Sequence, residues 1–395
     1  MIRSATTTNE IADRPPDAPP AARDALSISF RPAEHRQAVL RDWRCLESRL
    51  GDVSLACSAD WTEAWLTHFG EAVPHRFAVA RRSALPVGVC LVTEGVAQRT
   101  GPIPVKSIHL GTAGEPESDS VCVEYNDVLV AGADRAEFLS GLLGRLHRER
   151  AWDELRFDGM TAASLQSLPT AETTWHVDTR DSYYFDLAGS RNAQIDSIAQ
   201  FGHATRKNIR KNLNAYGDLQ TEWAETTDHA ESIFEDLIRL HQARWNADGK
   251  PGCYASKPFE NFHRDLIARL IPSGRMGLFR VRSGGDVVGC LQLFIDRNRA
   301  LVYQAGSAPY SGRQSPGMIA DVLCIEECLR RGFDAYDFLA GDSHHKRKLS
   351  THRNQLVWAV YRRPRWKFQA LRVARRLKRE VRSVVSKTKR AGQHD

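Results

Sequence analysis

Three consecutive residues, Ser315, Pro316 and Gly317, have the types that begin a helix and leave its backbone open to a ligand. A serine hydroxyl can accept a hydrogen bond from the first turn, and proline is tolerated at the first helical position because its missing N–H has no partner there. Unpaired backbone N–H groups at a helix start attract anions. The run therefore predicts a binding site for a phosphate-bearing ligand.

A second polar group follows further along the chain. Residues 335–339 read as a short strand that carries Asp337, and the loop beyond it contains Lys346 within a basic stretch. Ligands collect at strand ends in α/β sheets. We predict that Asp337 positions or accepts a proton, with a structural role in fixing the following loop as the alternative. Lys346 would bind a phosphate or a developing negative charge.

The elements that must hold these residues can be read from residues 300–350. Apolar residues recur after the Ser-Pro-Gly run at intervals of four, three and four, and the pattern ends at Gly332. They are Met318, Val322, Ile325 and Leu329. This spacing predicts one buried stripe along a helix. The segment therefore reads strand, turn, helix, strand and basic loop, and we expect the turn and the second strand end to face one cleft.

The order of these residues resembles the CelD-like (BioF2-like) branch of the GNAT acyltransferases, over residues 60–362. The matching positions are Tyr303, Gly306, Ser315, Pro316, Gly317, Asp337, Phe338, Gly341 and Lys346. That branch is similar in fold to the Fem-type aminoacyl-tRNA-dependent peptidyl transferases. The resemblance implies a GNAT-type fold and acyl transfer without a covalent enzyme intermediate.

By this resemblance the chain is an N- or O-acyltransferase. It would move an acyl group from acyl-CoA, acetyl-CoA being the simplest, to an amine or hydroxyl of a small or sugar-derived acceptor, as in polysaccharide or envelope biosynthesis. The donor would lie at Gly312, Gln314, Ser315 and Gly317, and no metal is implied. Residues 312–317 match the usual GNAT pyrophosphate signature poorly. Two alternatives therefore stay open: a Fem-like transferase that uses charged tRNA, and a non-catalytic scaffold of an exopolysaccharide assembly.

Cations gather in residues 197–217, a segment without any acidic residue. Four of them, spaced four apart in pairs, share one side of a predicted helix, so they need either an anionic ligand or full solvation. The segment also resembles the family's Thr-Arg-x-Asn-Ile-Arg pattern. Further along the chain, Arg244 precedes a loop that would cover a site entrance. The candidate substrate-binding residues are Arg206, Lys207, Arg210, Arg244 and Tyr303.

Two stretches that lie 201 positions apart share one pattern. Residues 76–92 and 277–293 each contain two apolar runs split by a short turn, which is typical of a β-hairpin. Each hairpin precedes a helix and a further strand, so the sequence predicts two copies of one α/β unit. By the resemblance these are tandem GNAT-like units, each a mixed, mostly antiparallel sheet flanked by helices. We place them at residues 28–190 and 191–362.

The first copy has no Ser-Pro-Gly turn. Instead, a long loop over residues 111–120 leads into residues 121–130, which read as a strand carrying Glu124 and Asp127. These carboxylates either face a substrate amine or lie on the polar face of the strand. The candidate catalytic residues are Asp127, Asp337 and Lys346.

The two ends of the chain differ from its middle. Residues 1–27 are rich in proline and alanine and predict a disordered segment that is not a signal peptide. Residues 362–390 contain 13 Lys or Arg and one Glu, which leaves the remainder with 42 basic and 47 acidic residues and a net charge of −5. Residues 363–395 therefore form a basic tail with amphipathic spacing. We predict that it contacts an anionic membrane surface or RNA, or else is a solvated extension.

The composition of the chain limits the cellular compartments in which the protein is expected. No stretch approaches the ~20 apolar residues of a membrane span. The eight cysteines form no C-x-x-C pair, and Cys324 and Cys328 share a helix without a second ligand pair, so we predict packed thiols in a reducing compartment. We therefore predict a cytoplasmic protein, with a peripheral position at the inner membrane face as the alternative that the tail offers.

Overall fold

The computed structural model describes residues 24–95, 103–166, 175–310, 315–374 and 376. The first unit contains β1 (Leu26–Pro32), α1 (Arg36–Leu50), α2 (Ala59–Phe69), β2 (His75–Arg82), β3 (Leu85–Glu94), β4 (Ser107–Leu110), β5 (Leu129–Val130), α3 (Arg135–Arg148), β6 (Glu154–Thr161) and α4 (Ala162–Gln166). Two long strands, β7 (Trp175–Asp186) and β13 (His352–Arg362), form a central ribbon. The second unit contains α5 (Leu187–Ala193), α6 (His203–Tyr216), β8 (Leu219–Trp223), α7 (Thr227–Ala247), α8 (Lys257–Leu270), β9 (Met276–Ser283), β10 (Asp286–Asp296), β11 (Arg299–Ser307), α9 (Pro316–Arg330), β12 (Ala335–Ala340) and α10 (His344–Lys348). Short 3-10 helices are η1 (Ala33–His35), η2 (Leu55–Cys57), η3 (Glu117–Asp119), η4 (Gly132–Asp134), η5 (Ile198–Gln200) and η6 (Cys253–Ala255).

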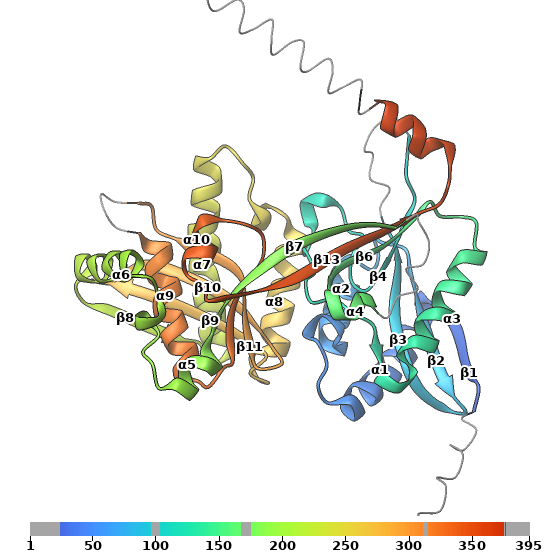
Figure 1. Ribbon diagram of the computed structural model, residues 1–395, viewed down its shortest axis with the longest axis horizontal. Helices are drawn as coiled ribbons and strands as arrows, with labels where there is room; N and C mark the ends of the chain where they lie inside the picture. The colour runs from blue at the N-terminus through green and yellow to red at the C-terminus, as the bar shows by residue number, and fades with distance from the viewer. Residues whose placement is uncertain (1–23, 96–102, 167–174, 311–314, 375, 377–395) are drawn as a thin grey trace, which may run out of the picture.

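All the strands of the described chain belong to one mixed sheet. Their order is β1-β2-β3-β4-β6-β13-β7-β12-β11-β10-β9-β8, with β5 paired to β3. Helices flank this sheet in both halves of the molecule (Figure 1). The predicted fold class, an α/β protein with mixed sheets flanked by helices, is confirmed.

The two units repeat one strand pattern. In the first, β2, β3 and β4 are antiparallel neighbours, and β4 is parallel to β6 across the crossover that contains α3. In the second, β9, β10 and β11 are antiparallel neighbours, and β11 is parallel to β12 across α9. Both predicted hairpins, residues 76–92 and 277–293, are therefore confirmed.

The central ribbon joins the two units into one sheet. β13 pairs with β7 from His352–Tyr184 to Tyr361–Trp175, and its other edge pairs with β6 of the first unit. β7 pairs in turn with β12 of the second unit, and Figure 1 shows the ribbon running from one half to the other. The division that we predicted at residue 190 therefore does not separate two independent sheets, because strand pairing returns the end of the second segment to the first unit.

A shared core also crosses the boundary between the units. Trp61 on α2 packs edge-to-face against Phe262 on α8 and Phe294 on β10, with ring centroids 5.2 Å apart in both pairs. Trp65 and Phe69 are buried on the same side of α2, as their helical spacing requires. The stripe on α9 is buried from Met318 to Ile325. Because aromatic contacts of this kind fix orientation as well as burying area, the two units form one packed body.

Helices long and apolar enough to span a bilayer are absent from the described residues.

Candidate active site

A large cavity opens where two parallel strands of the second unit separate. β11 and β12 pair only from Arg299–Leu301 to Ala335–Asp337, although β11 continues to Ser307 and β12 to Ala340. Between their unpaired ends lies a cavity of about 950 Å³. Cavities at the carboxyl ends of parallel strands are common ligand sites, so we take this one as the candidate active site.

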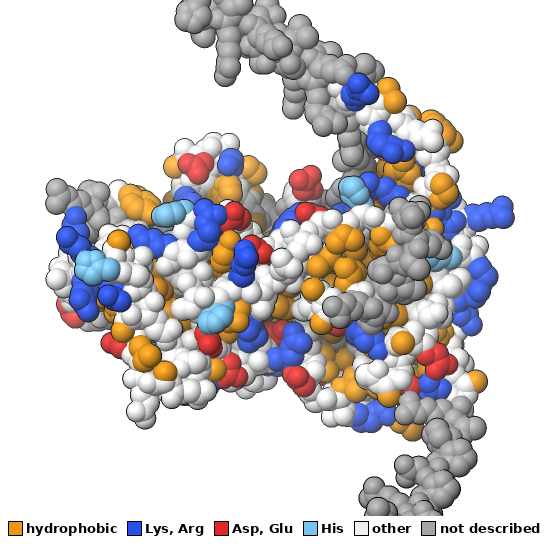
Figure 2. Space-filling model, in the orientation of Figure 1, with side chains coloured by type: hydrophobic (Ala, Val, Ile, Leu, Met, Phe, Trp, Pro, Cys, Tyr) orange, Lys and Arg blue, Asp and Glu red, His pale blue; other side chains and the backbone are white. Residues whose placement is uncertain are grey.

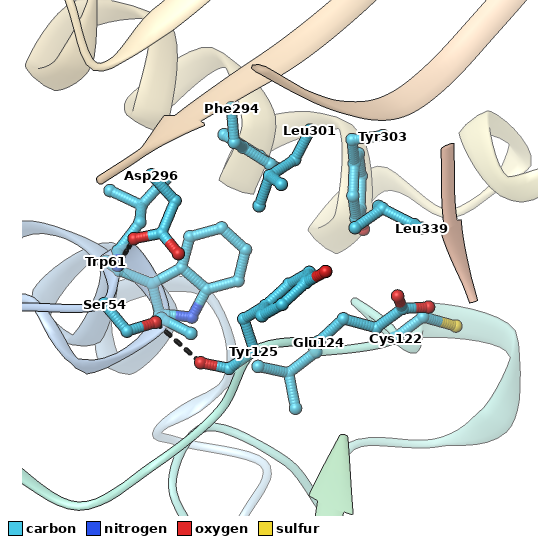
Figure 3. A pocket seen from close by; sticks show the side chains of 13 residues that line it. Ser54, Trp61, Cys122, Glu124, Tyr125, Phe294, Asp296, Leu301, Tyr303 and Leu339 are labelled. Atoms are coloured by element: carbon cyan, nitrogen blue, oxygen red, sulfur yellow. Dashed lines mark hydrogen bonds between the residues drawn. The ribbon is translucent and has the colours of Figure 1, made fainter. Parts of the chain in front are cut away.

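Both units contribute to its wall. The second unit supplies β11, the start of α9, the end of β12, α10 and part of α7, and the first unit supplies the segment from Ser120 to Glu124. A smaller cavity of about 30 Å³ shares four lining residues with the large one, and there Glu124 and Tyr125 of the first unit lie across from Tyr303 and Leu339 of the second (Figure 3). The site is therefore built between the units.

Glu124 is the carboxylate that reaches this wall. Its Oε2 accepts a hydrogen bond from the backbone N–H of Ala340 at 2.8 Å. Burial raises the pKa of Glu124 to about 7, although the Ala340 hydrogen bond and the Lys346 charge oppose the shift. A carboxyl group with a pKa near neutrality, placed in a cavity, has the properties of a general base.

Lys346 lies in the same wall, as its place after the second strand predicted. Its Nζ donates to the carbonyl oxygens of Leu339 at 3.0 Å and Ala340 at 2.8 Å. Burial lowers the pKa of Lys346, against the opposing charge of Glu124. The backbone of Ala340 thus connects the two side chains, because its N–H donates to Glu124 and its carbonyl oxygen accepts from Lys346.

A second basic side chain, His345, lines the cavity beside Lys346. Its Nε2 lies 2.6 Å from Asp321 Oδ2 on α9. Burial opposes the charged form, but the Asp321 hydrogen bond and charge raise the pKa of His345 overall. The wall formed by α10 is therefore suited to an anionic group.

Asp337 does not line the cavity, and its surroundings fit the structural alternative. Its side chain is fully buried and pairs with Arg299 at 2.7 Å. It also accepts hydrogen bonds from the Tyr125 hydroxyl at 2.5 Å, the Ser182 hydroxyl at 2.8 Å and the backbone N–H of Leu339 at 2.8 Å. With its oxygens fully occupied, Asp337 holds the Tyr125 segment and the turn after β12 in place.

Asp127 also lies outside the cavity. It pairs with Arg135 at 2.5 Å and accepts a hydrogen bond from the Ser164 hydroxyl at 2.7 Å. Residues 121–128 are not a strand, because Cys122 and Tyr125 have φ values of 45° and 54°. The sequence pattern drew attention to both Glu124 and Asp127. Because the backbone between them is irregular, only the Glu124 side chain reaches the cavity.

The Ser-Pro-Gly turn reaches the cavity through its glycine. α9 begins at Pro316 as predicted, and Gly317 and Met318 line the wall. Ser315 does not cap the helix through its hydroxyl; its backbone N–H instead donates to Asn212 Oδ1 on α6 at 2.7 Å. A Cβ atom added at Gly317 would meet only Ser307 Oγ, at 3.9 Å. Gly317 therefore leaves open space beside the helix start.

The remaining predicted ligand residues divide into two groups. Tyr303 and Arg244 both line the cavity, and the Tyr303 hydroxyl donates to the Val121 carbonyl at 2.7 Å, which ties the first-unit segment to β11. Gly312 and Gln314 lie outside the described residues.

The structure places the basic residues of α6 apart from the cavity. Arg206, Lys207 and Arg210 line a separate groove of about 460 Å³ together with His203, and basic side chains gather over α6 in Figure 2. Asn212, which contacts the start of α9, lies on the other side of the helix. Among the described residues, none pairs these four side chains with a carboxylate. Their role in substrate binding stays a prediction, now for a groove of its own.

Charge reversal in this groove gives a direct test. We expect Lys207→Glu with Arg210→Glu to weaken binding of an anionic ligand about tenfold or more, because attraction becomes repulsion. The unfolding free energy should change by less than about 0.5 kcal/mol, since exposed cations without ion pairs contribute little. Fluorescence anisotropy with acyl-CoA and with tRNA measures the ligand affinity, and thermal denaturation measures the change in stability. The control variant is Arg41→Glu on α1. Lost stability with unchanged affinity would identify a structural helix instead.

The first unit closes the space that corresponds to the cavity. Asn126 Nδ2 bridges the parallel strands β4 and β6 by donating to the carbonyls of Leu110 at 2.9 Å and Asp158 at 3.1 Å. Gly111 and Gly159 allow this close approach: both have positive φ, and a Cβ would lie 2.4 Å from Asn126 Oδ1 and 2.3 Å from the Val123 carbonyl oxygen. Among the described residues, the parallel strands whose ends separate to form a cavity are therefore β11 and β12 of the second unit, whereas Asn126 closes the gap between β4 and β6.

Comparison with known proteins identifies chains of similar fold. Residues 203–347 match the model of the acetyltransferase (GNAT) domain, whereas a search of curated proteins found no match. FemX is similar in structure, with a TM-score of 0.53, 12% identity, and 87% of this chain and 99% of that chain covered. So is the C-terminal domain of a proposed lysylphosphatidylglycerol synthetase from Agrobacterium fabrum, with a TM-score of 0.52, 11% identity and coverages of 83% and 93%.

A third solved structure, a conserved protein of unknown function from Bacteroides thetaiotaomicron, has a TM-score of 0.50 at 12% identity and covers 85% of this chain and 100% of that chain. At such low identities these similarities establish the fold alone. The fold is that of two tandem GNAT-like units, and the match to the acetyltransferase (GNAT) domain model covers residues 203–347 of the second unit.

Proposed function

We propose that this protein is a GNAT-type acyltransferase of the CelD-like branch. It transfers an acyl group from acyl-CoA or a similar thioester to an amine or hydroxyl of a small or sugar-derived acceptor. The observation that carries the proposal is the meeting of Glu124 and Lys346 in the cavity at the separated ends of β11 and β12.

The cavity fits an extended thioester donor. From Val302 to Ser307, the edge of β11 that faces β12 has no strand partner among the described residues, so its backbone groups are available to an extended ligand. Gly317 opens the start of α9 to a phosphate, and the basic side chains of His345 and Lys346 lie in the same wall. Met318 and Phe338 supply apolar surface to the same wall.

The acceptor is activated by the first unit. Glu124 removes a proton from the attacking amine or hydroxyl as the new C–N or C–O bond forms. The C–S bond of the thioester breaks, and the thiolate leaves and takes up a proton. Lys346, held by two carbonyl groups, stabilises the negative charge that develops on the reacting carbonyl. Holding the acceptor and the donor in one cavity further increases the reaction rate, because the reacting groups are already close together and oriented.

The donor half of the proposal is tested by Gly317→Val. We expect affinity for acetyl-CoA to fall about tenfold or more, because the new side chain occupies the space beside the helix start. The melting temperature should stay close to wild type, since the nearest atom to a new Cβ is 3.9 Å away. Isothermal titration calorimetry measures the affinity. Gly144→Val on α3, also in open space, is the matched control, and wild-type affinity in Gly317→Val would refute this donor site.

Fem-like transfer from aminoacyl-tRNA is the second candidate. The groove on α6 favours it, because cations that no carboxylate of the described residues pairs, lying outside the cavity, suit a large polyanionic donor. A panel of acyl-CoAs and charged tRNA in a thermal-shift assay separates the two enzymes. Stabilisation by neither favours the third reading, a non-catalytic scaffold in an exopolysaccharide assembly.

A further inference from the structure

The basic tail begins as an ordered helix that is fastened to the first unit. Residues 366–374 are helical. Just before and within this helix, Arg365 and Lys367 pair with the fully buried Asp153 at 2.7 and 2.5 Å. Leu371 is 5% exposed, so one side of the helix packs against the protein. Our predicted boundary at residue 363 therefore lies before a segment that belongs to the packed structure.

Upstream contacts fix the direction of this helix. The Arg363 guanidinium lies 3.8 Å from the centre of the Trp152 ring and donates to the carbonyls of Leu146 and His147 at the end of α3. Arg362 lies over the Phe368 ring at 5.6 Å. Cations over aromatic rings and at helix carbonyl ends are favourable placements. These contacts fix the orientation of the helix relative to the first unit.

The opposite side of the helix exposes apolar groups. Trp366 is 72% exposed and Val373 is 58% exposed. They lie seven residues apart, which is two helical turns, with Ala370 between them on the same side. Trp366 leaves most of its large surface in contact with solvent, which favours an apolar or interfacial partner.

The sequence extends this pattern beyond Val373. Leu377, Val381 and Val384 follow it at intervals of four, four and three residues, which continues one stripe at helical spacing. At 100° per residue Arg372 and Arg376, the two cations of the described helix after Leu371, fall away from the stripe, and the sequence beyond them contains further Lys and Arg residues. A tryptophan at the edge of an apolar stripe, with cations on the other face, is the pattern of a helix that lies in a lipid interface.

We propose that this C-terminal helix docks the protein on an anionic bilayer surface, with Trp366 and Val373 entering the headgroup region. The two components of the pattern decide between lipid and RNA. An RNA ligand would use the cations and leave the apolar stripe in water, whereas an anionic bilayer engages both. The contacts at Asp153 hold the first unit against that surface. The inference is independent of the acyl donor, because none of these residues lines the cavity.

Flotation of the full-length protein with vesicles tests the proposal. We expect binding to vesicles of equal parts phosphatidylcholine and phosphatidylglycerol, little binding to phosphatidylcholine alone, and weaker binding at high salt. Trp366→Ser with Val373→Ser should lower the bound fraction about tenfold, while Val177→Ser, which alters an apolar residue on β7 that is 51% exposed, should not. Thermal denaturation confirms that each variant is folded.

Tryptophan quenching by brominated lipids reports the contact itself. The wild-type signal should fall on binding, and Trp366→Phe should lose most of that change. Full binding by the double serine variant would overturn the proposal. So would a mobility-shift result in which single-stranded RNA binds, resists the apolar substitutions and is released by Arg372→Glu, because the ligand of the tail would then be RNA.

Discussion

Replacing Glu124 with glutamine is expected to lower kcat by about 10²- to 10⁴-fold, the usual contribution of a general base, while donor affinity changes little. Glutamine keeps the shape and the acceptor oxygen for the Ala340 N–H but cannot take a proton. The expected split, with kcat lowered and donor binding retained, is that of a group needed in the transition state. Steady-state kinetics and calorimetry measure the two quantities.

The pH dependence gives a second readout for Glu124. A base must be deprotonated to act, so turnover of the wild type should rise as pH increases through about 7, the raised pKa of this carboxyl, and this rise should vanish in Glu124→Gln. The contribution of Glu124 to folding stability should change in the opposite direction and decrease as the pH rises. Because the folded-state pKa lies above the ordinary 4.5, the folded protein holds the proton more tightly, and this contribution is lost as pH rises from about 4.5 to 7.

Asp127→Asn is the informative comparison for Glu124. The two carboxylates lie three residues apart, but Asp127 pairs with Arg135 outside the cavity. Its substitution should leave kcat per folded molecule close to wild type. A large loss of turnover in Asp127→Asn, with none in Glu124→Gln, would return the catalytic assignment to the one that the sequence pattern predicted.

The second large effect is expected at Asp337. Substitution by alanine should lower the unfolding free energy by about 3–5 kcal/mol, since it leaves the half-buried Arg299 without its counter-ion and three further donors without an acceptor. Denaturant unfolding measures the loss. Asp334→Ala is a matched control: Asp334 pairs with Arg191 at the same 2.7 Å as Asp337 with Arg299, but with side chains 46% and 40% exposed, so it should cost less than about 1 kcal/mol.

The opposite outcome would also be clear. If Asp337→Asn kept the wild-type melting temperature and lost turnover, Asp337 would act on the substrate, and the hydrogen bonds from Tyr125 and Ser182 would be incidental to folding.

Local pattern was sufficient to predict the repeated parts of the fold. The hairpins at residues 76–92 and 277–293 and the stripe on α9 depend on residue spacing within one element, which the sequence displays directly. The return of β13 to the first unit depends instead on pairing between residues some 200 positions apart, such as Arg362 with Glu154, and no spacing within either strand records it.

The candidate site was predictable only in part, for a similar reason. Lys346 and Gly317 were found because each follows a recognisable strand or precedes a helix. Glu124 was not chosen over Asp127, because their separation depends on the left-handed backbone at Tyr125, a conformation that a tyrosine rarely adopts. The position of Asp337 at a strand end predicts a catalytic residue, but its burial comes from Arg299 on β11 and from Tyr125 in the irregular segment before β5, which no local spacing displays.

The insertion of β13 between β6 and β7 also sets an order of events during synthesis. Until residues 352–362 have left the ribosome, β6 has an unpaired edge, and β7 lacks one of its two neighbours. Such edges invite pairing with other chains. The nascent protein therefore completes its sheet only after residue 362 has been translated, and its dependence on chaperones should be greatest just before that point.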